Sequence, residues 1–474
     1  MQERQSILEN LRWLAGANIV VKPIWFAFLL LSARLLGPEE FGRYMFAIAY
    51  VSIIGVIFEG GIDVLSVREL AIEPTKFPRF FSHTSFFKVL SATVVGIIAL
   101  AGTFVYDLSS TNRAAIVAAI PYAMFSTLMV HFRFIVRSFE IMKLEAHSIL
   151  LEKFSVIGCC GIALFLGQGA ELFTVSYSFA YLIATVGTFS LVVKHIGWPH
   201  WNISRQYLFQ HVIKPAMPYA LMGFFMIVYF RSGTLMLSWL TGREDLVGYY
   251  NAGYRLLEGF ILFPSVIMGP IFPSFSRYRE DKPRIKNLLI QGGRTISVLS
   301  IAISVPIFIF KEDFTALLFG QEYAQASTAL GIIVLSMIPV GLTWVFGTLV
   351  AAVGRQGKAN ILIFLVTLLN LSLHYLLIPS MGVVGAAVTT LVTESAMSIA
   401  CIWIVRDFLD VNEFFTLFAK AFVPALIAYI IKSIDFFPAP FLVELAILMV
   451  IMISSFFFLR LVTIADIRRV TGRS

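Results

Sequence analysis

Residues 84–108 read TSFFKVLSATVVGIIALAGTFVYDL, and this stretch decides the fold. A helix that crosses a lipid bilayer needs about 20 predominantly apolar residues, and this segment supplies them with a single lysine near its start. Of the 474 residues in the chain, 58% are hydrophobic and 14% are charged. Soluble proteins carry about a quarter charged residues, so the sequence predicts an all-α integral membrane protein.

Apolar blocks of this kind recur along the chain, and we expect about fourteen transmembrane helices. The alternating pattern of a membrane β-barrel is absent from the sequence. The connecting segments are too short for a soluble catalytic domain. The predicted spans are residues 12–35, 43–66, 84–106, 114–136, 146–167, 172–194, 215–239, 247–270, 294–311, 327–351, 359–379, 383–405, 415–433 and 440–461.

The positions of the basic residues predict the topology. The chain has 36 Lys and Arg and a net charge of +8. Most of them fall in alternate loops, which would be cytoplasmic if the N-terminus is cytoplasmic. The positive charge therefore indicates orientation rather than nucleic-acid binding. We expect both termini on the cytoplasmic side of a bacterial inner membrane.

A short motif occurs twice and predicts the domain organisation. Residues 37–47 read GPEEFGRYMFA, and residues 242–252 read GREDLVGYYNA. The copies precede the second and eighth predicted helices, so they share one membrane orientation, as in a parallel repeat. We expect the acids to lie in first helical turns, where they favour the positive dipole end.

This repeat predicts two six-helix lobes joined by a segment that lies in the membrane interface. The predicted regions are an N-terminal lobe (1–195), an interfacial linker (196–214), a C-terminal lobe (215–406), and an extra helix pair with a cytoplasmic tail (407–474).

Three basic residues lie deep within predicted spans, namely Lys22, Arg231 and Arg255. A charge in hydrocarbon is costly, so such residues are candidates for function. If they meet in one central cavity, they fit an anionic substrate, and Arg and Lys both bind phosphate well. Pairing with buried acids is the alternative, which the spacing of Arg255 and Glu258 favours.

The acids at similar depth are Glu59, Asp63, Glu258 and Glu394. They could carry H⁺ or Na⁺ during transport, or they could neutralise the deep cations. Pro23 follows Lys22 directly, and proline removes a backbone hydrogen bond from a helix. Pro23 is therefore either a functional hinge beside a binding site or a static kink.

Cofactor chemistry has no support in the sequence. Cys159, Cys160 and Cys401 lie in apolar segments without metal-ligand spacing. We therefore predict no metal, no cofactor and no catalytic residue.

Residues 35–71, LLGPEEFGRYMFAIAYVSIIGVIFEGGIDVLSVRELA, resemble the polysaccharide transporter family of Wzx-like flippases. They carry that family's LGP-[ED]-x-[FY]-G-x-Y opening and its G-[LI]-x-x-x-x-x-R-E-x-A ending. Residues 246–278 and 379–394 look similar to later parts of the same family. The resemblance covers nearly the whole chain.

The resemblance implies the fold of the multidrug/oligosaccharidyl-lipid/polysaccharide exporters and transport by alternating access. The implied substrate is an undecaprenyl-pyrophosphate-linked oligosaccharide for O-antigen, capsule or exopolysaccharide. The implied partners are H⁺ or Na⁺, membrane lipid, a polysaccharide polymerase and glycosyltransferases.

Three other functions stay open. A lipid II flippase and a multidrug/cation antiporter belong to the same superfamily, and the antiporter would have an acid-dominated cavity. A membrane-embedded polymerase or glycosyltransferase would need a sizeable extramembrane loop.

Overall fold

A computed structural model describes residues 7–59, 61–105, 108–167, 169–434 and 439–461. Within these residues the chain is helical and contains no strand, as predicted. It divides into two compact units, Met1–Gly248 and Tyr249–Ser474, which we describe separately.

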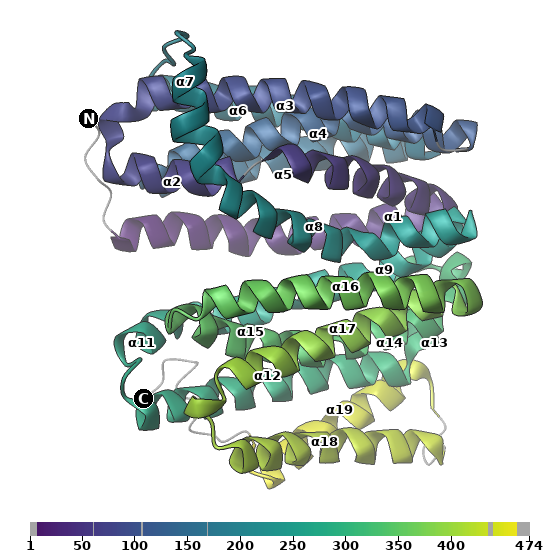
Figure 1. The fold of residues 1–474 in the computed structure, drawn as a ribbon. Helices are drawn as coiled ribbons and strands as arrows, with labels where there is room; N and C mark the ends of the chain where they lie inside the picture. The colour runs from purple at the N-terminus through teal and green to yellow at the C-terminus, as the bar shows by residue number, and fades with distance from the viewer. Residues whose placement is uncertain (1–6, 60, 106–107, 168, 435–438, 462–474) are drawn as a thin grey trace. The chain divides into compact units, whose positions relative to one another are not determined.

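The first unit consists mainly of long apolar helices (Figure 1). Its elements are α1 (Ile7–Glu59), α2 (Ile62–Ile72), η1 (Pro74–Lys76), α3 (Phe77–Val105), α4 (Ser110–Ser138), α5 (Met142–Leu166), α6 (Gly169–His195), α7 (Arg205–Tyr207), η2 (Leu208–Ile213), α8 (Lys214–Thr241) and the beginning of α9 (Glu244–Phe260).

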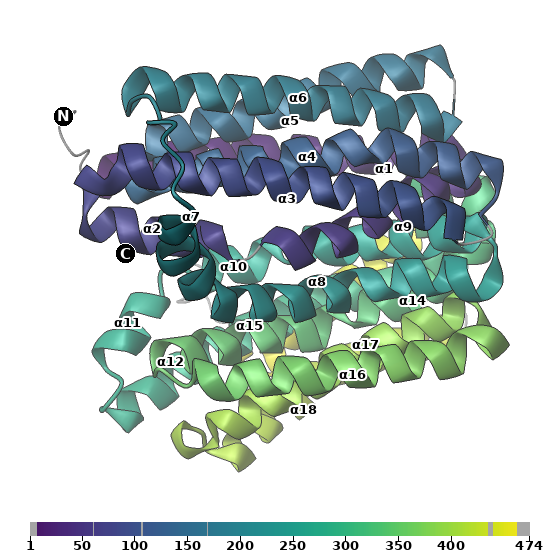
Figure 2. The same cartoon turned by 45° about the horizontal axis from the view of Figure 1, so that its top comes forward.

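Helices α4 and α6 pack closely in this unit, and both views show them alongside α3 and α5 (Figure 2). Small hydroxyl residues of α6 hold this contact. Ser178 donates to the Ala118 carbonyl of α4 at 2.6 Å, and Thr185 donates to the Phe125 carbonyl at 2.8 Å. Small and hydroxyl residues are what membrane helices use to approach one another, because lipid supplies no hydrophobic drive between them.

Helix α1 contains two of the predicted spans and changes direction between them. Gly37 has φ 72°, a left-handed conformation that glycine adopts without steric cost. The break falls at the start of the first motif copy. By contrast, Pro23 lies inside the helix without such a departure. A hinge at Pro23 stays a prediction.

The second predicted span ends earlier than the hydropathy pattern indicated. A new helix, α2, begins at Ile62 after Gly61, whose φ is 63°. The predicted range 43–66 therefore includes the first turn of α2. This restart places the Asp63 carboxylate at the positive end of a helix dipole, which stabilises the negative charge.

The segment before α8, predicted to lie in the membrane interface, packs on the start of α3. The Ser204 amide donates to His83 Nε2 at 2.9 Å, and the Arg79 guanidinium lies 4.2 Å from the Tyr207 ring centroid. Trp198 and Trp201 are exposed. Exposed tryptophans beside basic residues suit a membrane interface, and this location stays a prediction.

The two motif copies contact each other within the first unit. A Cβ added to Gly42 would lie 1.8 Å from the Glu244 carbonyl oxygen, and one added to Gly248 would lie 1.9 Å from the Pro38 carbonyl oxygen. Only glycine permits such a close approach of two backbones. The repeated motif therefore builds a packing contact as well as two helix starts.

The second unit is also helical. After the rest of α9 it contains α10 (Leu262–Met268), α11 (Phe272–Arg277), α12 (Lys282–Ile309), α13 (Lys311–Phe319), η3 (Gln321–Ala326), α14 (Ser327–Leu335), α15 (Met337–Ala352), α16 (Gln356–Met381), α17 (Val383–Ile404), η4 (Arg406–Phe408), α18 (Val411–Ser433) and α19 (Phe441–Phe458).

The last two helices of the second unit, α18 and α19, lie side by side (Figure 1). They pack on α12 through an aliphatic cluster that includes Ile301, Ala421, Leu448 and Met452. They lie where the sequence predicts an extra helix pair, and their separation from the C-terminal lobe stays a prediction. The assignment of residues to two six-helix lobes stays a prediction.

Twelve helices of the described residues are long and apolar enough to cross a membrane. The segment Arg12–Val56 is counted as one although it contains two predicted spans. The predicted span 247–270 is divided between α9 and α10, because the helix is interrupted at Ile261. The multi-pass fold is confirmed, and the number of about fourteen crossings stays a prediction.

Candidate functional site

A cavity of about 250 Å³ lies inside the first unit. It is bordered by α1, α3, α4, α5, α6 and α8, and its lining is partly apolar and partly charged. The charged side chains are Arg133, Glu152 and Arg231, and Tyr122, Tyr181, Ser126 and Thr127 add hydroxyl groups. The cavity therefore offers two guanidinium groups against one carboxylate.

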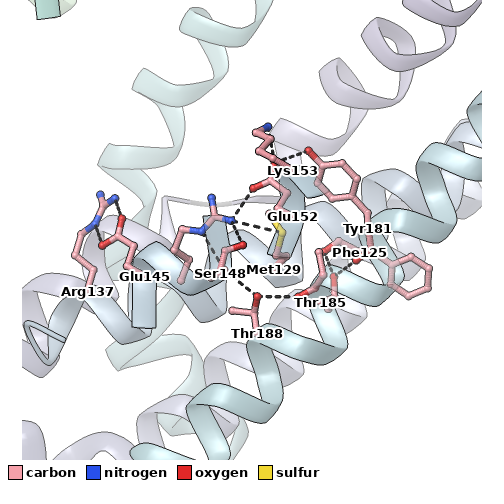
Figure 3. A network of polar contacts seen from close by, with 12 residues as sticks. Phe125, Met129, Arg137, Glu145, Ser148, Glu152, Lys153, Tyr181, Thr185 and Thr188 are labelled. Carbon is pink, nitrogen blue, oxygen red and sulfur yellow. Dashed lines mark hydrogen bonds and ion pairs between the residues drawn. The ribbon is translucent and has the colours of Figure 1, made fainter. Parts of the chain in front are cut away.

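Glu152 of α5 organises the charged wall of this cavity. Its carboxylate accepts from Arg133 Nη2 at 2.6 Å, from Lys153 Nζ at 2.7 Å and from the Tyr181 hydroxyl at 3.0 Å. In Figure 3, Glu152, Lys153 and Tyr181 point toward one another. The Glu152 side chain is 5% exposed. Two cations on one buried carboxylate leave this wall with a net positive charge.

Helices α4 and α5 carry these residues at helical spacing. Arg133 and Arg137 are one turn apart on α4, and Glu145 and Glu152 are two turns apart on α5. Arg137 pairs with Glu145, as Figure 3 shows. Between the pairs, Ser148 bonds Thr188 at 2.8 Å. These side-chain contacts fix the positions of α4, α5 and α6 relative to one another around the cavity.

Arg231 also lines the cavity. It belongs to α8, the helix that follows the linker, whereas Arg133 and Glu152 belong to α4 and α5. Among the residues that the structure describes, it makes no hydrogen bond or ion pair. A half-buried guanidinium with five donors and no described acceptor is suited to an anionic ligand.

Lys22 of α1 precedes Trp25 by one helical turn, so the two share a face of the helix. Lys153 Nζ lies 4.2 Å from the Trp25 ring centroid. The α1 segment with Lys22 therefore lies beside α5 where α5 carries Lys153. Within the described chain, Lys22 makes no hydrogen bond or ion pair.

Asp63 does not pair with Lys22, although the sequence allowed that pairing. Its carboxylate lies 3.1 Å from Lys88 Nζ and 2.9 Å from His131 Nδ1. Lys88 lies near the start of a predicted span, and its side chain is fully buried. The restart of the helix at Gly61 turns Asp63 toward α3 and α4, and hydropathy does not show that turn.

The remaining sequence candidates lie elsewhere. Arg255 of α9 pairs with Glu258 one turn later, which is the alternative that their spacing favoured. Glu394 of α17 is buried in the second unit. The side chain of Glu59 lies outside the described residues. That Arg255 shares a chamber with Lys22 and Arg231 stays a prediction.

No group of three His, Cys, Asp or Glu able to hold a metal ion gathers in the described part of the chain. The three cysteines are free thiols. Asn370 donates across the helix interface to Thr393 at 3.3 Å.

Sequence reasoning missed Arg133, Lys88 and His131. Arg133 and Lys88 fall within a turn or two of predicted span ends, so they were interpreted as topology signals. The pairing of Arg133 and Arg137 at i, i+4 with Glu145 and Glu152 at i, i+7 on the next helix was a signal that could have found the network.

Outside the membrane spans, Glu244 of the second motif copy links the start of α9 to α4 and α8. Its Oε1 accepts from Asn112 Nδ2 at 2.8 Å and from the Ser238 hydroxyl at 2.6 Å. Burial raises the pKa of the Glu244 carboxyl, and these hydrogen bonds oppose the shift.

These observations define a multi-pass helical membrane protein with a charged internal cavity. Residues 7–279 match the family model described as "Polysaccharide biosynthesis protein". The chain belongs to this family, and the resemblance stated from the sequence is confirmed. It is a membrane transporter rather than an enzyme.

Two relatives agree with the family assignment. The chain is 22% identical to the capsular polysaccharide biosynthesis protein CapF of Staphylococcus aureus, over 82% of this chain and 96% of that protein. It is 30% identical to the probable flippase AglR of Haloferax volcanii, over 33% of this chain and 34% of that protein.

Among solved structures, the chain resembles the lipid II flippase MurJ in an inward closed conformation. The TM-score is 0.78 at 14% identity, with 96% of this chain and 99% of that chain covered. An identity this low shows a shared fold and no more.

Proposed function

We propose that this protein flips a polyprenyl-pyrophosphate-linked oligosaccharide across the cytoplasmic membrane by alternating access. The product would be used for O-antigen, capsule or exopolysaccharide. Family membership supports the class of cargo. The single observation that carries the chemistry is the cavity in which Arg231 and Arg133 face one carboxylate.

The size of the cavity indicates which part of the cargo it takes. A volume of about 250 Å³ is smaller than the roughly 300–1,000 Å³ of pockets that hold drug-sized ligands. That space suits a diphosphate group and is too small for an oligosaccharide. In this proposal the cavity binds the pyrophosphate, and a water-filled path spares the sugars contact with hydrocarbon, where unpaired polar groups cost several kcal/mol each.

Lys22, Arg231 and Arg255 are proposed as the cationic substrate-binding residues, with Pro23 as the hinge next to Lys22. Asp63, Glu59, Glu258 and Glu394 are proposed as counter-ions or as carriers of H⁺ or Na⁺. Both termini are proposed to be cytoplasmic, in accord with the basic loops.

Replacement of the cations by alanine tests the proposal. Lys22→Ala, Arg231→Ala and Arg255→Ala should each abolish surface glycan while the protein still inserts in normal amount. Arg243→Ala is the matched control, because Arg243 is exposed and pairs with Asp245 outside the spans. Unaltered surface glycan in all three variants would show that these residues do not bind the substrate.

A drug/cation antiporter is the second candidate from the same superfamily. Cation export favours a cavity dominated by acids, whereas this cavity has more guanidinium than carboxylate groups. A lipid II flippase would carry the same diphosphate. Deletion of the gene separates the two flippases, because the lipid-linked sugar that accumulates on the cytoplasmic face identifies the cargo.

A further inference from the structure

A second charged cluster in the first unit has no role in the charged wall of the cavity. Asp63 of α2 lies between Lys88 of α3 and His131 of α4. The side chains of Lys88 and His131 are 0% exposed. Ionisable groups at such depth are costly, so a cluster of three is a candidate functional site.

The hydrogen bonds around His131 accommodate both protonation states of its imidazole. Nδ1 lies 2.9 Å from Asp63 Oδ1, and Nε2 lies 3.0 Å from Thr84 Oγ1. The Thr84 hydroxyl is also 3.0 Å from the Phe80 carbonyl oxygen. A hydroxyl can both donate and accept.

In the neutral state, His131 Nδ1–H donates to Asp63, and Thr84 donates to Nε2. When Nε2 gains a proton, the Nε2–H donates to Thr84 Oγ1, and the Thr84 hydroxyl rotates to donate to Phe80. Each state leaves every polar atom of this chain of contacts with a partner. The proton goes on and off one nitrogen atom without a change of helix packing.

Proton uptake changes the charge of the cluster from zero to +1, because Lys88 is positive and Asp63 is negative. This change occurs next to the cavity. Lys88 Nζ lies 3.4 Å from Thr127 Oγ1, and Thr127 lines the cavity. A proton on His131 and an anion in the cavity therefore stabilise each other by electrostatic attraction.

The other charged groups on neighbouring elements are engaged elsewhere. Within the described chain, the groups that act on Asp63 are Lys88 and His131, and those that act on His131 are Asp63 and Lys88. The neighbours with other partners are Arg68 with Tyr219 of α8, Glu69 with Lys76 of η1, His83 with Ser204, His211 of η2 with Tyr207, and Arg133 with Glu152.

We propose that Asp63, Lys88, His131 and Thr84 form a proton-binding site whose occupancy is linked to anion binding in the neighbouring cavity. The linkage rests on the proposed function, because it requires an anionic headgroup in that cavity. The proton on His131 travels with the headgroup and reduces the negative charge that is carried.

Titration of the imidazole tests the proton site without any ligand. Nitrogen NMR of histidine-labelled protein in lipid nanodiscs should show a histidine signal that changes with pH as its imidazole gains a proton and that is lost in His131→Gln. His374→Gln is the matched control, since His374 is equally buried but has no carboxylate partner among the described residues. Absence of a titrating His131 signal would overturn the proposal.

Binding of inorganic pyrophosphate tests the linkage. Relative to His131→Gln, the wild type should gain at least about five-fold in affinity between pH 8 and pH 6, the lower end of typical couplings between sites. The variant corrects for protonation of pyrophosphate itself. Equal pH dependence in both proteins would overturn the linkage and leave the proposed function intact, whereas failure of pyrophosphate to bind at any pH would contradict the proposed function.

Thr84 supplies a second variant if His131→Gln does not fold. Thr84→Ser keeps the hydroxyl that switches between donor and acceptor, and should keep the wild-type pH dependence of pyrophosphate binding. Thr84→Val lacks that hydroxyl and should lose the dependence. The same pH dependence in Thr84→Val and Thr84→Ser would contradict the proposed exchange of hydrogen bonds.

Discussion

The interiors of the two units differ in the kind of polar group they bury. In the first unit, Lys88, His131, Glu145 and Glu152 are buried, and their contacts extend to a cavity. In the second unit most of the buried polar groups are hydroxyls, and fewer ionisable side chains, among them His374 and Glu394, are buried. Several of its charge pairs, such as Lys286 with Glu413 and Arg355 with Asp407, are partly exposed. Buried charge is costly in lipid, so its concentration in one unit indicates where ligand chemistry is located.

Removal of a central carboxylate should show this difference most strongly. Glu152→Ala leaves Arg133 and Lys153 without their acid inside the first unit. Breaking a buried pair by removal of one partner costs about 3–5 kcal/mol. We expect a loss of this size in the free energy of unfolding, measured by denaturant titration in mixed micelles.

The matched change in the second unit is Glu444→Ala. Glu444 accepts from Lys432 at 2.5 Å, but that lysine is 36% exposed and can be hydrated after the change. A loss of about 1 kcal/mol or less is expected. Equal losses in Glu152→Ala and Glu444→Ala would mean that the two interiors do not differ in electrostatic cost.

The contact between the motif copies offers the next largest effect. Gly42→Ala places a Cβ 1.8 Å from the Glu244 carbonyl oxygen, so the backbone must shift. Overpacking of this kind costs about 1–3 kcal/mol, which a thermal unfolding series would detect. Gly16→Ala on the same helix is the control, because nothing lies within 4 Å of its added Cβ. If Gly42→Ala is as stable as the control, the motif copies do not depend on this close approach.

The comparison also shows what the sequence could and could not predict. Hydropathy identified the class of fold, and the repeated motif identified two helix starts, because these features are local. Arg231 was singled out because one charge in a long apolar block is visible in one segment. The structure places it in the lining of the cavity, and its role in binding stays a prediction. The partners of Asp63 were not predicted, because they depend on a helix restart at Gly61 and on the packing of α2 against α3 and α4.

Two carboxylates outside the membrane spans should respond to pH in opposite directions. Burial raises the pKa of Glu244 above 4.5 in the folded protein. The folded state then binds more protons than the unfolded state, so stability falls as pH rises from 4.5 through the raised value. Glu244→Gln should remove this part of the pH dependence of the unfolding temperature. If the unfolding temperature of the variant depends on pH as that of the wild type does, the raised pKa of Glu244 is contradicted.

Asp407 of the second unit should give the smallest effect. Hydrogen bonds from Arg355 at 2.6 and 2.7 Å hold the pKa of Asp407 below 3.8. The pair therefore stabilises the fold above that pH, and its contribution is lost as pH falls through the lowered value. Because Asp407 is 39% exposed, Asp407→Asn should cost about 0.2–1 kcal/mol at neutral pH, and less in high salt. A stability loss that does not depend on salt would contradict the description of Arg355 and Asp407 as a surface ion pair screened by solvent.

Flipping by purified protein in sealed vesicles tests the central claim most directly. A polyprenyl-pyrophosphate-linked oligosaccharide is placed in the outer leaflet, and its loss of access to a membrane-impermeant glycosidase is followed over time. The wild type and Arg243→Ala should protect the lipid at equal rates, whereas Arg231→Ala should reduce the rate to that of empty vesicles. Undiminished flipping by correctly inserted Arg231→Ala would contradict a cavity in which this guanidinium binds the pyrophosphate.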